Sequence, residues 1–90
     1  MQTVIIAGRL PADPQCLYTE EKAMATFKVV VKGATASEEI ICMAYGGLAK
    51  IVGEYLKAGR LVAVEGRLNA NTLTIDNLQL LDPRYHKDTK

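Results

Sequence analysis

The sequence predicts an all-β protein with a single helix. Five stretches combine β-branched or aromatic residues with strand-like spacing, and turn-forming residues bound them. One further stretch carries apolar residues at helical spacing. With 90 residues, of which 49% are hydrophobic and 23% charged, the chain is long enough for one hydrophobic core and too short for two. We therefore expect one domain over residues 1–82 and a flexible C-terminal tail over residues 83–90.

The first three strands are expected at residues 4–10, 23–32 and 38–45. The first is a β-branched run that ends at Pro11. In the second, alternate residues share one face that should meet the core, namely Ala25, Phe27, Val29 and Val31. The third has an unbroken apolar middle, which predicts that both of its faces are covered.

A helix should follow the third strand. Its apolar residues recur at the spacing of one helical stripe, which consists of Leu48, Ile51, Val52, Tyr55 and Leu56. Gly59 is expected to cap the helix C-terminus. Two more strands, at residues 60–68 and 72–81, are joined by residues 69–71, whose composition Asn-Ala-Asn suits a tight hairpin.

This order of elements fits a five-stranded OB-fold barrel with its helix between strands 3 and 4. The hydrophobic periodicity alone would also allow an α+β sandwich.

The charges of the chain are nearly balanced. Eleven basic and ten acidic side chains give a formal charge of +1, so affinity for nucleic acid must come from local clusters rather than from an overall field. The first ten residues lack a basic leader and carry only a four-residue apolar run, from which we expect a soluble intracellular protein with no membrane span. Cys16 and Cys42 are far apart and lie in no metal-ligand spacing, so we expect neither a metal site nor a disulfide framework.

The sequence contains no recognisable catalytic constellation. The only histidine, His86, lies in the expected tail without a nucleophile motif beside it, and the glycines form no phosphate-binding loop. We expect that the protein is not an enzyme and uses no cofactor.

Several short motifs occur in the order typical of one protein family. They are Gly8-Arg9-Leu10, Asp13-Pro14, Tyr18-Thr19, Ala25-Thr26-Phe27, Ala44-Tyr45-Gly46, Leu48-Ala49-Lys50-Ile51-Val52, Tyr55-Leu56-Lys57, Gly59 and Val64-Glu65-Gly66-Arg67-Leu68. With these motifs the chain resembles the bacterial single-stranded DNA-binding proteins from about Val4 to Asp82. The resemblance implies an OB fold, single-stranded DNA as the ligand and a role in DNA replication and repair.

The departures from the family pattern fall on the residues that hold DNA. Members of the family stack bases on tryptophans and on one further aromatic residue, but this sequence has no tryptophan and only Tyr45 matches an aromatic position. Glu39 stands where the strand-three tryptophan belongs. Both hairpin arms are short, at residues 33–37 and 69–71, and no counterpart of the family's acidic-tipped tail is found. Losing three stacking platforms at about 2 kcal/mol each reduces the expected affinity roughly ten-thousand-fold.

Two hypotheses therefore remain open. The first is weak, non-catalytic binding of single-stranded DNA or RNA by a dimer or tetramer. Its candidate site residues are Tyr45, Lys28, Lys32, Arg9 and Arg67. The alternative is a protein–protein interaction module that has lost nucleic-acid binding. Its candidate interface residues are Ile41, Met43 and Ile40, since the third strand has become apolar on both faces.

Each candidate site residue also has a structural interpretation. The lysines suit a charged strand edge, the arginines suit barrel closure, and the tyrosine suits a packed or subunit contact. The resemblance implies a cytoplasmic protein, with the plastid stroma as the alternative location, because short members of this kind also occur in cyanobacteria and plastids.

Overall fold

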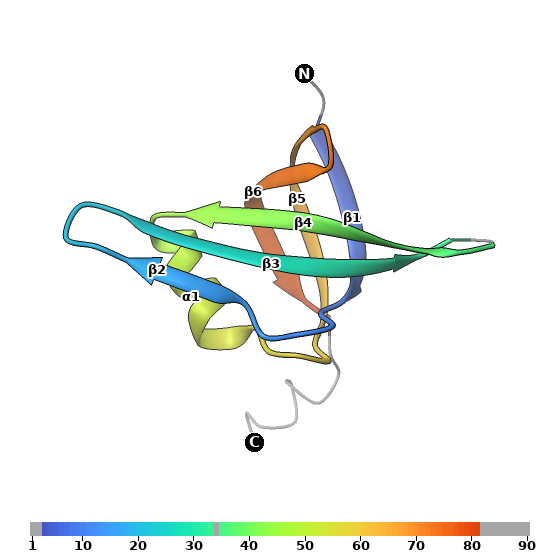
Figure 1. The fold of residues 1–90 in the computed structure, drawn as a ribbon, viewed down its shortest axis with the longest axis horizontal. Coiled ribbons are helices and arrows are strands. Elements are labelled where there is room, and N and C mark those ends of the chain that lie inside the picture. The colour runs from blue at the N-terminus through green and yellow to red at the C-terminus, as the bar shows by residue number, and fades with distance from the viewer. Residues whose placement is uncertain (1–2, 34, 82–90) are drawn as a thin grey trace.

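Six strands and one helix form from residues 3–33 and 35–81, which the computed structural model describes (Figure 1). In chain order they are β1 (Thr3–Arg9), β2 (Gln15–Tyr18), β3 (Ala23–Lys32), β4 (Ser37–Tyr45), α1 (Gly47–Tyr55), β5 (Leu61–Asn69) and β6 (Thr72–Leu80). Asp82 and the tail predicted over residues 83–90 lie outside the described part of the chain.

Five of the strands close into a barrel. The strands follow the order β1-β5-β6-β4-β3-β2, and a further pairing of β1 with β3, between Arg9 and Val30, closes the ring. All neighbours are antiparallel except β4 and β6, which are parallel. The predicted five-stranded OB-fold barrel is confirmed, with the five expected strands as β1, β3, β4, β5 and β6.

The additional strand β2 was not predicted. It pairs with β3 outside the ring and widens the sheet at the front of Figure 1. Because β2 enters the count, the helix lies between β4 and β5 instead of between strands 3 and 4, although it still follows the third of the expected strands.

The barrel core consists of the inward halves of the alternating strands. Ala25, Phe27 and Val29 of β3 are buried as the alternation predicts, and Val31 is partly buried. Cys42 and Ala44 of β4 are also buried. The opposite faces of β3 and β4 are therefore free to carry a site on the outside of the barrel.

Helix α1 packs against β2, β3 and β4 through a narrower stripe than predicted. Ala49, Val52 and Leu56 are buried, whereas Ile51 and Tyr55 are exposed, because a helix of only nine residues meets the barrel along one line. The expectation for Gly59 was also wrong. The helix ends at Tyr55, and Gly59 instead adopts a left-handed φ of 90° in a later turn, where its N–H donates to the Leu10 carbonyl at 2.7 Å.

Two glycines allow the strands to approach closely where the barrel bends and closes. A Cβ at Gly8 would overlap the Val30 carbonyl oxygen at the β1–β3 junction. A Cβ at Gly66, beside the irregular β5–β6 register, would overlap the Thr74 carbonyl oxygen. The Gly-Arg-Leu motifs that begin at Gly8 and Gly66 therefore contain glycines that barrel geometry requires.

Candidate nucleic-acid interface

The outer face of β3 and β4 is the surface on which the predicted site residues gather. Outward positions of β3 alternate with the core positions, and they are Met24, Thr26, Lys28, Val30 and Lys32. The register pairs Met24 with Tyr45, Thr26 with Met43 and Lys28 with Ile41, so these residues of β4 lie on the same face. Lys28, Lys32 and Tyr45 thus share one surface of the barrel.

Tyr45 ends β4 and is 50% exposed. Its hydroxyl group lies 3.8 Å from the Met43 sulfur, to which it donates a weak hydrogen bond. The ring is therefore positioned on the outer face and still accessible to a flat ligand.

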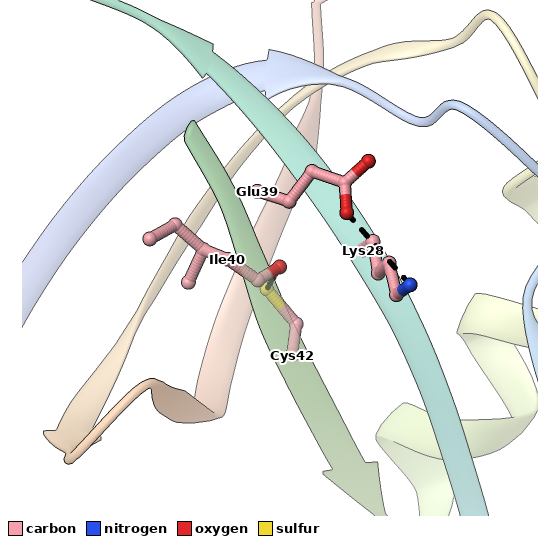
Figure 2. A network of polar contacts seen from close by, with 4 residues as sticks. All are labelled: Lys28, Glu39, Ile40 and Cys42. Carbon is pink, nitrogen blue, oxygen red and sulfur yellow. Dashed lines mark hydrogen bonds and ion pairs between the residues drawn. The ribbon is translucent and has the colours of Figure 1, made fainter. Parts of the chain in front are cut away.

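Lys28 and Glu39 form an ion pair across β3 and β4 (Figure 2). The Lys28 Nζ lies 3.7 Å from Glu39 Oε1, and both side chains are 55% exposed. Glu39 is paired with Val30, one step further along the same face, so the contact is diagonal. The Glu39 carboxylate thus partly neutralises the lysine that is nearest to the middle of the face.

Arg9 and Arg67 lie on two other strands, β1 and β5. Arg9 is paired with Val30, which lies between Lys28 and Lys32 on β3, and its Nη1 donates to the Gly59 carbonyl at 2.9 Å. Arg67 is paired with Thr74, which is in turn paired with Met43, so it points to the outside of the barrel two strands away from β4.

The candidate protein-interface residues separate onto two faces. Ile41 and Met43 point outward, exposed and partly buried respectively, whereas Ile40 is partly buried against the core. Cys42, between Ile41 and Met43 in the sequence, points to the core side, and its Sγ lies 3.8 Å from the Ile40 carbonyl oxygen (Figure 2). Burial raises the pKa of the Cys42 thiol to about 12. An Ile40–Ile41–Met43 surface is therefore not continuous, and only Ile41 and Met43 adjoin Tyr45.

Sequence reasoning missed Leu17 of β2. Leu17 is paired with Met24 and is 57% exposed, which adds an apolar side chain to the outer face beside Tyr45. The only sequence signal was a short apolar run between Pro14 and Thr19. Among residues 3–33 and 35–81, no three His, Cys, Asp or Glu side chains cluster in a way that could hold a metal ion, and no helix is long and apolar enough to cross a membrane.

Residues 1–79 match the sequence model of the Single-strand binding protein family. The chain belongs to this family. The single-stranded DNA-binding protein of Bacillus cereus is 32% identical, over 93% of this chain and 62% of its own length. That of Fusobacterium nucleatum is also 32% identical, over 76% of this chain and 51% of its own length.

The chain thus spans only between about half and two-thirds of the length of these curated relatives. The alignment with the Bacillus cereus protein runs over 105 positions, more than the 90 residues of the whole chain, so the relative carries insertions inside the matched region.

The fold is shared with the SSB domain of a Synechococcus protein, whose crystal structure superposes with a TM-score of 0.81 at 21% identity and covers 88% of this chain and 94% of that one. The curated relatives named above are bacterial, so the comparisons give no support to the plastid alternative.

Proposed function

We propose that this member of the single-strand binding protein family is a non-catalytic protein that binds single-stranded DNA through the outer face of β3 and β4. The observation that carries the proposal is the placement of Tyr45, half-exposed, on the same face as Lys28 and Lys32. An aromatic ring and two ammonium groups spaced along one face suit a strand of bases and phosphates. Lys28 and Lys32 are four residues apart on one strand, roughly 13 Å, so they could contact different phosphates.

The affinity of one subunit for DNA should be low. Only one aromatic side chain of this face matches the stacking positions of the family, and Lys28 is already engaged by Glu39. Stacking is worth about 1–3 kcal/mol per base, so a single platform supplies a small part of what three or four would.

A dimer or tetramer would compensate for weak contacts by placing several sites on one strand. The edge of β1 supports such an assembly, because β1 pairs along its length with β5 but meets β3 only at Arg9. Ile5 on this strand is 68% exposed, so it offers an apolar side chain to a second subunit at this edge. In this proposal the oligomer acts in the cytoplasm, in DNA replication and repair.

A protein partner is the second candidate ligand for the same face. Ile41 and Tyr45 are exposed on this face and adjoin the partly buried Met43. The three side chains together form a small apolar surface. In that case the ligand would be an apolar peptide or domain instead of a nucleic acid.

Substitution of Tyr45 tests the proposed function directly. Tyr45→Ala should weaken binding of a fluorescent oligo-dT by roughly 5- to 150-fold, as expected for the loss of one stacking platform. Tyr55→Ala is the matched control, because Tyr55 is also exposed but lies on helix α1. Equal affinities for the two variants would remove Tyr45 from the site. No binding by the folded wild-type protein, to oligo-dT or to oligo-rU, would instead favour the protein partner.

A further inference from the structure

A groove of about 450 Å³ lies where the β2–β3 turn meets the end of β4. Leu17, Met24 and Tyr45 line it in one cross-strand row, since Leu17 is paired with Met24 and Met24 with Tyr45. Met24 is partly buried, whereas Leu17 is 57% exposed and Tyr45 is 50% exposed. Met24 therefore forms the floor of the groove, and Leu17 and Tyr45 form its walls.

The turn beside the groove is held by its own hydrogen bonds. The Thr19 N–H donates to the Lys22 carbonyl at 2.7 Å, and Thr19 Oγ1 accepts the N–H groups of Lys22 at 2.9 Å and Glu21 at 3.3 Å. Lys22 and Glu21 contribute one basic and one acidic side chain to the lining, and Lys22 forms no ion pair with any of the described residues. The groove is thus preformed, and side chains of both charge signs lie next to its apolar walls.

A second and more polar hollow, of about 350 Å³, follows along β3. Its polar lining consists of Gln15, Thr26, Lys28 and the Asp13 carboxylate, whose Oδ1 accepts the N–H of Ala58 at 2.8 Å. The pairing of Gln15 with Thr26 places this hollow beside the Leu17–Met24 pair. Two residues along a strand correspond to about 7 Å. An amide, a hydroxyl and an ammonium group therefore lie within about one nucleotide of the apolar groove.

We propose that the Leu17–Met24–Tyr45 groove holds one unstacked nucleobase, and that the Gln15–Thr26–Lys28 hollow receives the sugar and phosphate of the same nucleotide. The tyrosine ring offers a stacking surface, and the thioether and the leucine offer polarisable and apolar contacts to the opposite face or edge of a base. The donor groups of the neighbouring hollow suit phosphate oxygens. This inference rests on the proposed function and adds strand β2 to the binding surface.

An abasic oligonucleotide separates the base contact from the phosphate contacts. Wild-type protein should bind oligo-dT at least roughly five-fold more tightly than an abasic strand of the same length, because only the former offers a base to the groove. Leu17→Ser should lower this ratio and leave the affinity for the abasic strand unchanged. Ile51→Ser is the matched control, since Ile51 is an exposed aliphatic residue on helix α1 and should leave the ratio as in wild type.

The possible results distinguish the groove from the wider function. If Leu17→Ser keeps the wild-type ratio while Tyr45→Ala still weakens binding of oligo-dT, the base groove is overturned and DNA binding stands. The groove is also overturned if Leu17→Ser and Ile51→Ser lower the ratio equally. If the folded wild-type protein binds neither strand, the proposed function fails, and the groove with it. Circular dichroism of each variant verifies that it is folded.

Discussion

Replacing Glu39 with glutamine should strengthen binding of single-stranded DNA. The Glu39 carboxylate lies 3.7 Å from the Lys28 ammonium group. Coulomb's law gives about 1 kcal/mol for two unit charges at this separation in water, and exposed ion pairs measure about 0.2–1 kcal/mol. Lys28 must give up this interaction when it binds a phosphate. Removing the carboxylate should therefore raise the affinity roughly 1.4- to 5-fold.

Fluorescence anisotropy with labelled oligo-dT, at salt concentrations from about 20 mM to about 200 mM, measures this change. One additional phosphate contact should steepen the slope of log affinity against log salt by about 0.7. Glu38→Gln is the matched control, because it removes the same charge from the adjacent position, which is paired with Val31 and makes no ion pair with Lys28. If Glu39→Gln leaves affinity and slope unchanged, or shifts them no more than Glu38→Gln does, Lys28 does not contact phosphate in the way proposed.

Three further predictions concern stability, the thiols and assembly. Gly8→Ala should lower the free energy of unfolding, measured in urea, by about 1–3 kcal/mol, because the added Cβ meets the Val30 carbonyl. A Cβ at Gly47 meets no other atom, so Gly47→Ala should be neutral or stabilising by up to about 1 kcal/mol. Equal losses of stability in the two variants would refute the close approach at Gly8. A thiol reagent at about pH 8 should modify the exposed Cys16 quickly and Cys42 only on unfolding. Cys42 is buried, and its pKa is raised to about 12, so its thiol stays protonated at this pH. Rapid modification of both thiols in the folded protein would contradict the burial of Cys42. Ile5→Lys should shift the mass measured by light scattering towards the monomer, and an unchanged oligomer would exclude the β1 surface as the subunit contact.

The outer face of the barrel was largely predictable because alternation along a strand assigns faces without knowledge of the fold. Phe27 marks the core side of β3, which puts Lys28 and Lys32 on the other side. The Ala44-Tyr45-Gly46 motif then places an aromatic residue at the end of β4. That Tyr45 lies beside Met24, and not beside a lysine, depends on the register of two strands, which alternation leaves undetermined.

The features that the sequence did not reveal depend on contacts between distant segments. Strand β2 has four residues, too few for a periodic pattern, and exists because its backbone pairs with β3. The engagement of Lys28 by Glu39 follows from a diagonal contact across two strands. The exposure of Ile51 reflects how the short helix rests on the barrel, since its spacing alone would also suit burial.

A salt series of oligo-dT binding by the folded, wild-type protein tests the central claim most directly. The proposal predicts measurable binding at about 20 mM salt that weakens with a log–log slope near −0.7 for each phosphate contacted, and a loss of affinity in Tyr45→Ala. The absence of binding at low salt by protein shown to be folded and oligomeric would contradict the assignment of the β3–β4 face to single-stranded DNA.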